Sequence, residues 1–413
     1  MRMRLWVLAF VAWVGLVGAS PASDLLQQAV GELRTHYYGY SPVDWDVLAK
    51  QSGHELEQAC TGQPQCGVET AARIIARLVR NIGDDHTFYL SPQRYQQFRA
   101  WFAGQPDSTP IYGITIPVFS EGRVLISEVR PRSAADLAGV RPYDRVVAVN
   151  GAPLSSLEDF RARINTDQPV RLTLLRGEER LQLTLSRQPY SLPVLPTLHA
   201  PRGLPEGVFV LRIPDFAVYQ QIGPRVHQLV LEAQANGAKA LIVDLRDNSG
   251  GEETECQGAP GAFVGNFALE MRTRSASVPF GYADGAVLGN DPKDPNPPYR
   301  LEQPARFTGR VAVLVSRGTA SCGEIMAYVL QQFGGIKVIG QRTAGVMNTA
   351  TEFWPLADGS ALAITYVRTF KTSGEALPEY VTPDIEMVYD PEAIARTGRD
   401  AMLEKALEVM GIR

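Results

Sequence analysis

The sequence predicts a multidomain α+β protein with a helical N-terminal region, a small β-rich domain and an α/β core. Three observations predict this class. Apolar residues recur at helical spacing before residue 84, short turn-bounded strand-like runs fill 111–190, and strands alternate with helices from 207 onward. A length of 413 residues fits two or three domains, and 45% hydrophobic with 20% charged residues is ordinary for a globular protein.

The first segment, 1–22, has the pattern of a secretory signal peptide. Two arginines in MRMR precede the apolar run LWVLAFVAWVGLV, and small residues follow, so cleavage is expected after Ala19 or Ala22. The apolar run is shorter than the ~20 residues of a spanning helix. We therefore expect an exported protein, periplasmic or secreted, with no stable membrane span after cleavage. An uncleaved membrane anchor is the alternative.

Helices are predicted for the N-terminal region, 23–108. LLQQAVGELRTHYY (25–38) and TAARIIARLVRNIG (70–83) carry the helical apolar spacing, and Asp44 is the expected N-cap of a helix between them. GQPDSTP (104–110) is predicted to be a linker because Gly, Pro and Ser dominate it.

The domain at 109–190 is predicted from short strand-like runs with two helical pieces. The runs are YGITIPVF, GRVLISEV, DRVVAVNG, PVRLTLLR and RLQLTLSR, and the helical pieces are SAADLAGV and LEDFRARIN. A Pro-rich connector, 191–205, follows this domain.

The core, 203–392, is predicted to be an α/β layer structure because strands and helices alternate along it. The strand-like runs are GVFVLRIPDF, KALIVDLR, RVAVLVS and IKVIG, with helices at GPRVHQLVLEAQANG and SCGEIMAYVLQQFGG. The polar, Gly- and Pro-rich stretch 270–300 is predicted to be loop. A C-terminal helix is expected within 393–413, at RDAMLEKALEVMG.

Charge and cysteine content limit the partners. The net charge of −4 and the lack of a basic patch argue against a nucleic-acid partner. Cys60 and Cys66 close a short loop and are the favoured disulfide, which leaves Cys256 with Cys322; free buried thiols are the alternative for that second pair. The cysteine spacing does not suit a zinc site, and no metal or phosphate-loop motif is present.

The stretch GTASCGEI (318–325) places Ser321 at the start of a predicted helix, directly after the strand RVAVLVS. Ser321 and Glu324 fit S-x-x-E, the capping box that satisfies the first helix amides. A serine at a helix N-terminus also sits in positive potential beside unpaired N–H groups, which can stabilise an oxyanion if a base activates the hydroxyl. Both interpretations stay open on this motif alone.

A second glycine-rich turn, DLRDNSGG (244–251), follows a predicted buried strand. Paired glycines permit a tight turn and a close backbone approach, so Gly250 or Gly251 could donate an N–H to an oxyanion. Ligands bind at the carboxyl ends of strands in open α/β sheets, which brings this turn and Ser321 toward one site. A simple strand-ending turn is the alternative.

Together, in order, these motifs make the chain resemble the carboxyl-terminal processing (tail-specific) and tricorn-type serine peptidases. GDDHTFYLSP (83–92) is similar to the D-x-H-T segment of that family, and YGITI with SAADLAGVRPYDRVVAVNG is similar to its PDZ domain. The resemblance covers nearly the whole chain after the signal peptide. It implies a crotonase-like α/β protease core behind a helical region and a PDZ domain, with no cofactor.

The resemblance offers two bases for Ser321. One branch of the family uses a lysine about twenty-five residues after the serine, but Val346 stands there, and Lys337 and Lys371 do not match. The other branch uses a histidine oriented by a glutamate, and here His86 and Glu379 fall in the matching segments. Imidazole titrates near neutral pH and a carboxylate can fix its tautomer, so a Ser321–His86–Glu379 triad is predicted.

Several alternatives to this triad stay open. Asp85 stands where tricorn-like enzymes have a serine, and His86 could be a structural histidine. Glu379 could be a solvated loop carboxylate, and Glu375 competes with it for the orienting role. Cys322, at a helix start, could itself be the nucleophile.

The predicted oxyanion hole consists of the Cys322 N–H with that of Gly250 or Gly251. The PDZ resemblance implies that the amides of Gly113, Ile114 and Thr115 hold the C-terminal carboxylate of a peptide or protein substrate. The sequence therefore predicts an exported serine endopeptidase. The rivals are a catalytically degenerate PDZ-containing binding protein and an esterase-like hydrolase.

Overall fold

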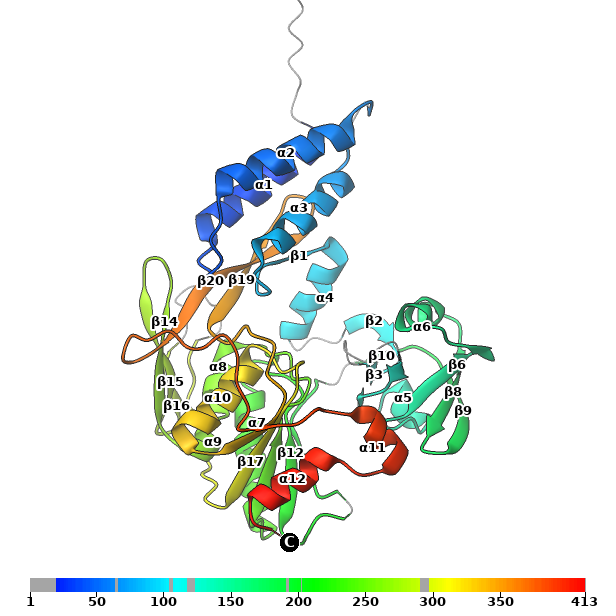
Figure 1. The fold of residues 1–413 in the computed structure, drawn as a ribbon, viewed down its shortest axis with the longest axis vertical. Coiled ribbons are helices and arrows are strands. Elements are labelled where there is room, and N and C mark those ends of the chain that lie inside the picture. Colours follow the sequence, from blue (N-terminus) through cyan, green and yellow to red (C-terminus); the bar gives the residue numbers. More distant parts are fainter. Residues whose placement is uncertain are drawn as a thin grey trace, which may run out of the picture. The chain divides into compact units, whose positions relative to one another are not determined.

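The computed structural model describes residues 20–63, 66–103, 107–116, 123–190, 193–201, 203–289 and 297–412. The chain divides into two compact units (Figure 1). A helical unit contains residues up to 92 and also 353–364, and a second unit contains 93–352 and 365–413. The predicted signal peptide lies outside the described residues, apart from its last three positions.

The helical unit forms as its apolar spacing predicts. It contains α1 (Pro21–His36), α2 (Trp45–Cys60), α3 (Val68–Ile82) and β1 (Phe88–Leu90). Asp44 is confirmed as the N-cap of α2, since its carboxylate accepts the N–H groups of Asp46 and Val47 at 3.1 and 3.0 Å. The apolar faces of the three helices pack together with side chains from the distant segment 353–364, including Leu356 and Leu362.

A sheet of antiparallel strands contradicts the prediction of loop over 270–300. Its strands are β14 (Phe267–Arg272), β15 (Ser277–Ala283), β16 (Ala286–Val287), β19 (Thr349–Pro355) and β20 (Ala361–Lys371), together with β1. β20 pairs with β1 through 361–363 and with β14 through 368–371. The prediction was wrong because β15 pairs with its neighbours β14 and β16, and β14 pairs with the distant β20, whereas Gly and Pro content does not reveal strand pairing.

The small β-rich domain has the predicted helices, α5 (Ala134–Leu137) and α6 (Leu157–Ile164), and a set of short strands. The strands are β2 (Asp107–Ile111), β3 (Ile114–Thr115), β4 (Val124–Leu125), β5 (Glu128–Val129), β6 (Arg145–Val149), β7 (Ala152–Pro153), β8 (Val170–Arg176), β9 (Glu179–Leu185) and β10 (Gln188–Tyr190). The linker prediction was wrong over 107–110, because β2 begins there and pairs with β10.

The α/β core is built on a sheet whose order is β11-β12-β13-β17-β18-β21. The strands are β11 (Thr197–His199), β12 (Val208–Arg212), β13 (Ala240–Asp244), β17 (Arg310–Val315), β18 (Lys337–Gly340) and β21 (Ile385–Glu386). From β12 onward the pairs are parallel, whereas β11 adds an antiparallel edge inside the predicted connector.

Helices cover both faces of this sheet (Figure 1). They are α7 (Ile222–Ala235), α8 (Glu253–Gly258), α9 (Gly261–Val264), α10 (Cys322–Gly334) and α12 (Ala401–Val409), while α4 (Pro92–Phe102) and α11 (Pro391–Thr397) lie outside it. Successive residues of β13 alternate between two apolar clusters, with Leu241 and Val243 in one and Ala240 and Ile242 in the other. Burial on both faces explains why KALIVDLR is a continuous apolar run.

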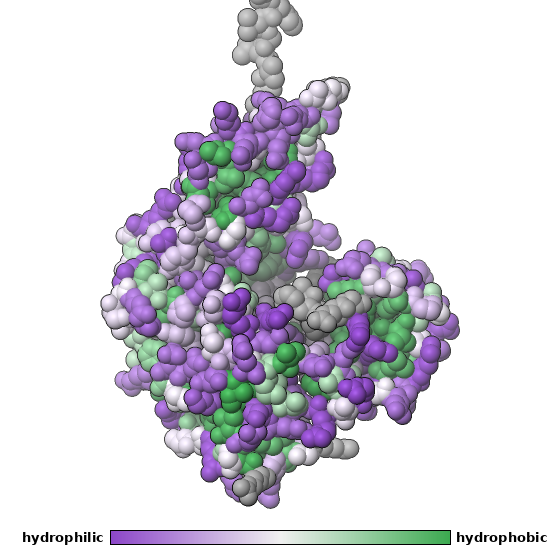
Figure 2. Space-filling view, viewed as in Figure 1, coloured by the Kyte–Doolittle hydropathy of each residue, from purple (hydrophilic) through white to green (hydrophobic). Residues whose placement is uncertain are grey.

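Both predicted disulfides are present, Cys60–Cys66 and Cys256–Cys322, so the free-thiol alternative is excluded. On the face shown in Figure 2, hydrophilic residues cover most of the surface. Within the described ranges, no helix combines the length and the apolar composition needed to cross a membrane.

Candidate active site

Ser321 occupies a strained turn between β17 and α10. Its backbone has φ +50° and ψ −119°, a conformation that costs about 1–3 kcal/mol for a residue with a side chain. Sharp strand-to-helix turns of this kind hold a catalytic serine with its hydroxyl exposed. Ser321 is partly exposed, whereas the next nine residues of α10 are buried. Such strain persists only where the surroundings hold it, and it supports a functional interpretation of Ser321 over a purely capping one.

Glycine is required where the turn 244–251 meets the turn that contains Ser321. A side-chain carbon at Gly250 would lie 2.6 Å from Ser321 Cβ and 3.0 Å from the Cys322 nitrogen, closer than such atoms approach. Gly250 also has φ +91°, a region that favours glycine. On the Ser321 side, a side-chain carbon at Gly323 would lie 2.9 Å from the Asn248 carbonyl oxygen. The two motifs singled out in the sequence are therefore in direct contact.

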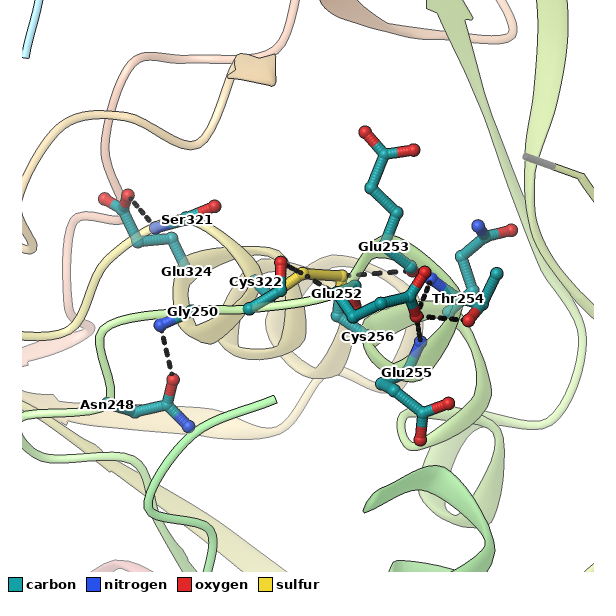
Figure 3. Close-up of a disulfide and its surroundings, with 12 residues drawn as sticks. Asn248, Gly250, Glu252, Glu253, Thr254, Glu255, Cys256, Ser321, Cys322 and Glu324 are labelled. Carbon is teal, nitrogen blue, oxygen red and sulfur yellow. Dashed lines mark hydrogen bonds between the residues drawn. A yellow bond between two sulfur atoms is a disulfide. The ribbon is translucent and has the colours of Figure 1, made fainter. Parts of the chain in front are cut away.

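Two of the predicted oxyanion donors, Gly250 and Cys322, lie beside Ser321 (Figure 3). The Cys322 N–H is the first of α10, so it has no acceptor within the helix. The Gly250 N–H donates to Asn248 Oδ1 at 2.9 Å. Gly251 pairs with Phe216 through a parallel bridge, in which the Phe216 N–H donates to the Gly250 carbonyl at 2.8 Å. The Gly250 N–H is therefore already used in a hydrogen bond, which leaves the Cys322 and Gly251 N–H groups as the better candidates for oxyanion donors.

Glu324 connects Ser321 to a second loop. Its fully buried carboxylate accepts the Ser321 N–H at 2.8 Å, which forms one half of the predicted capping box. It also accepts the N–H groups of Gly345 and Val346 at 2.9 and 3.0 Å and the Thr343 hydroxyl at 2.5 Å. Burial raises the pKa of this carboxyl, and its hydrogen bonds oppose that shift. The cap was predictable from S-x-x-E, whereas the loop contacts were not, because that motif gives no information about distant partners.

No lysine stands at the alternative base position. Val346 is buried and its N–H donates to Glu324. Lys337 pairs with Asp384 and Lys371 with Glu375, each at 2.8 Å. Glu375 forms an ion pair with Lys371, which favours Glu379 as the residue that orients the base.

Glu379 lies beside the loop that Glu324 holds. Its carbonyl accepts the Met347 N–H at 3.0 Å, and its Cγ would lie 3.7 Å from a side-chain carbon at Gly345. Val381, two residues on, donates its N–H to Thr343 Oγ1 at 2.8 Å. The Glu379 side chain is exposed. Backbone pairing of 379–381 with 343–347 thus joins the predicted glutamate to the Ser321 turn through Glu324.

His86 belongs to the helical unit, whereas Ser321 and Glu379 belong to the other unit. It follows Gly83, which ends α3 in the left-handed conformation, and it is buried, with 8% exposed. Asp84 Oδ1 accepts the His86 N–H at 2.9 Å, and the Asp84 carbonyl accepts the N–H of Thr87 at 2.9 Å. The approach of His86 to Ser321 is therefore a proposal.

The predicted carboxylate-binding amides lie on a close-packed turn. Gly113 has φ +81°, and a side-chain carbon there would lie 2.1 Å from Ser133 Cβ, so glycine is required. The following strand, Ile114–Thr115, pairs antiparallel with β5. Across the described ranges, no group of three or more His, Cys, Asp or Glu residues could hold a metal ion.

A serine on a strained strand-to-helix turn, beside a glycine turn at the ends of parallel strands, defines the core of a serine hydrolase. Residues 207–387 match the model of peptidase family S41, and residues 125–176 match that of a PDZ domain. The predicted resemblance to the carboxyl-terminal processing peptidases is confirmed, and so is the predicted fold class.

The chain is similar to curated serine and carboxyl-terminal-processing proteases. The chain is 24% identical to a probable CtpA-like serine protease of Staphylococcus aureus, over 84% of this chain and 63% of the relative. It thus spans less than two thirds of that protein. It is also 24% identical to a carboxyl-terminal-processing protease of Synechocystis, over 88% of this chain and 83% of the relative. Among solved structures, a photosystem II D1 C-terminal processing protease matches with TM-score 0.54 and 21% identity, covering 95% of this chain and 98% of that one.

Proposed function

We propose that this protein is an exported serine endopeptidase that cleaves peptides or protein tails through an acyl-enzyme. Ser321 Oγ attacks the scissile carbonyl and passes its proton to His86, which returns it to the leaving amine. Glu379 fixes the tautomer of His86 and stabilises the imidazolium. The N–H of Cys322, with that of Gly250 or Gly251, stabilises the tetrahedral oxyanion. Water then releases the acyl group by the same route.

The strained turn at Ser321 carries this proposal. A serine that only capped α10 could adopt an extended backbone, as Ser20 and Ser133 do at their helices. Ser321 instead has positive φ, and Gly250 and Glu324 hold it there. The absence of a lysine at position 346 favours His86 as the base.

The PDZ domain is proposed to select substrates by their C-termini. Backbone amides of Gly113, Ile114 and Thr115 would bind the terminal carboxylate while the peptide adds to β3. A substrate with a free C-terminus should therefore show a KM at least about tenfold lower than the same peptide with an amidated C-terminus. Equal KM values for the two peptides would contradict this role.

Export is proposed on the N-terminal pattern and on the two disulfides, which form in oxidising compartments. The first helix favours one cleavage position. Ser20 caps α1 by accepting the Ser23 N–H at 3.2 Å, and Ala22 is fully buried in that helix. Cleavage after Ala19 leaves the cap and the buried residue in place. The intact mass of the protein recovered from the periplasm or the medium tests this position.

A fluorophosphonate probe tests the nucleophile. The wild-type chain should gain the mass of one adduct, Ser321→Ala should gain none, and Ser373→Ala, which changes an exposed turn serine, should label like the wild type. His86→Ala should slow labelling and peptide cleavage together. Peptide binding without labelling or turnover in the wild type would favour the non-catalytic PDZ protein. Cleavage of esters but not amides would favour the esterase.

A further inference from the structure

The disulfide Cys256–Cys322 lies directly at the proposed oxyanion hole (Figure 3). Cys322 follows Ser321, and its backbone N–H is one of the proposed donors. The sulfur–sulfur bond joins this residue to α8, which begins at Glu253, two positions after Gly251. One covalent bond therefore links the helix that carries the nucleophile to the segment that carries the second donor.

The contacts around this bond are close. Cys322 Sγ lies 3.4 Å from the Glu252 carbonyl oxygen and 3.7 Å from that of Gly251, so its sulfur packs against the donor segment itself. Glu252 is the N-cap of α8, and its carboxylate accepts the Thr254 N–H at 2.9 Å. Gly251 thus directly precedes the N-cap of the helix that carries Cys256, so the disulfide and the donor are adjacent along the chain.

Both cysteines are buried, with 1% of Cys256 and 4% of Cys322 exposed. They lie in the main apolar cluster of the core, together with residues of α7, α9 and α10. Oxyanion stabilisation depends on donors held within fractions of an ångström of the position where charge develops. Ser321 also keeps its strained backbone only while its neighbours hold it. A covalent link at this position controls both requirements.

We propose that the Cys256–Cys322 disulfide positions the oxyanion hole, so that the peptidase reaches its full kcat only when this bond is formed. This inference rests on the proposed function. In the activating step, the two thiols lose two protons and two electrons to a disulfide oxidant, which becomes two thiols. In a reducing compartment the chain is synthesised with poor activity, and in an oxidising one it matures. Cys256 and Cys322 are positioning residues, because they act through the Cys322 and Gly251 amides.

The chain provides a matched control. Cys60–Cys66 closes a loop at the end of α2, with a sequence separation of 6 between its cysteines, and it belongs to the helical unit. Alanine at both positions of either pair removes one disulfide. Cys322→Ala keeps the backbone N–H, so the double variant Cys256→Ala/Cys322→Ala removes the link and leaves both proposed donors present.

The test compares kcat, KM and the affinity for a peptide boronate, whose tetrahedral adduct occupies the oxyanion hole, at a temperature where circular dichroism shows every variant folded. Cys256→Ala/Cys322→Ala should lower kcat and boronate affinity by about 10- to 100-fold with KM within about twofold, because only transition-state binding is lost. Cys60→Ala/Cys66→Ala should match the wild type. Unchanged kcat in the first variant overturns the inference, and so does an equal loss in both.

Two further results separate this inference from the proposed function. A wild-type chain without Ser321-dependent turnover overturns both, whereas an active wild type with an equally active Cys256→Ala/Cys322→Ala overturns the inference alone. If that variant does not fold, wild-type protein is unfolded in urea and refolded with or without dithiothreitol, and thiols are mapped by alkylation and mass. Refolded protein with the pair reduced and kcat lowered, recovering on reoxidation, supports the inference; full kcat with the pair reduced overturns it.

Discussion

The proposed nucleophile, Ser321, and the proposed base, His86, are held in place by different kinds of contact. His86 sits in a short turn in which Asp84 bonds to residues two and three positions ahead. Ser321 sits in a turn held by Gly250, by Glu324 and by a disulfide that spans 66 positions. Both turns depend on distant segments, since β1, two residues after the proposed base, pairs with β20, but only the Ser321 turn is also tied by a buried carboxylate and a disulfide.

This difference predicts that equivalent changes have unequal effects in the two regions. A substitution in the turn before His86, where Asp84 bonds over two and three positions, should disturb fewer of these links. A disturbance near Ser321 should propagate, because each support connects to another segment. The substitutions below test this contrast, beginning with the largest expected effect.

Gly250→Ala against Gly83→Ala compares two glycines with positive φ. Alanine at Gly250 meets Ser321 Cβ at 2.6 Å, so kcat should fall more than about 100-fold. Alanine at Gly83 meets nothing within 4 Å, so the cost should be only about 1 kcal/mol of stability for the left-handed backbone, with kcat nearly unchanged. Steady-state kinetics and urea unfolding measure both. Similar kcat losses in the two variants would remove the contrast.

Glu324→Gln against Asp84→Asn compares the two supporting carboxylates. An amide at Glu324 replaces one acceptor oxygen with an NH₂ group facing N–H donors, so about 1–3 kcal/mol of stability and at least tenfold in kcat should be lost. In Asp84→Asn the remaining side-chain oxygen can still accept the His86 N–H, so kcat should change less than about threefold. Steady-state kinetics and urea unfolding apply to both variants. A larger loss of activity in Asp84→Asn than in Glu324→Gln would show that catalysis depends more on the turn of His86 than on the turn of Ser321.

The core, rather than the helical unit, should give the protein its pH-dependent stability between pH 5 and 8. Burial raises the pKa of Glu255 to about 7, although the Gln220 and Gly223 N–H groups oppose the shift. Since the folded pKa lies above the unfolded value of 4.5, this stabilisation is complete below about pH 4.5 and is lost as pH rises through 7. The loss is about 3 kcal/mol. In the helical unit, the raised pKa of Tyr37, about 12, lies outside this range.

Thermal unfolding from pH 5 to 8 checks this expectation. The wild-type Tm should fall across the range from this source, and Glu255→Gln should flatten the profile. Asp215, whose pKa burial raises to about 6, contributes a smaller drop of the same sign. An unchanged slope in Glu255→Gln would locate the pH dependence elsewhere.

Asp44→Ala should have the smallest effect. It removes the N-cap of α2 and should cost about 1 kcal/mol of stability without changing kcat. Urea unfolding and peptide cleavage measure the two quantities. A kcat loss as large as that of Glu324→Gln would show that helical-unit stability controls catalysis.

Local patterns predicted the elements that local forces define. The apolar spacing of α3 and the cap at Asp44 were visible in the sequence, and the buried run of β13 followed from its composition. β15 was missed because its partner strands, β14 and β16, stabilise a segment that its Gly and Pro content marks as loop. In the site, the contact of Gly250 with Ser321 and the four bonds of Glu324 could not be predicted, since they join residues that no spacing rule connects.

Strand β20 determines when the helical unit can be completed during synthesis. Leu90 pairs with Ala361, and Leu356 and Leu362 fill the apolar cluster of α1–α3, so the unit needs residues made about 270 positions after its first part. At a synthesis rate of about 5–20 residues per second, β20 is made roughly 15–50 s after the three helices. The His86 segment therefore reaches its final form only when almost the whole chain has been translated. If His86 is the base, a nascent chain therefore cannot cleave other proteins until synthesis is almost complete.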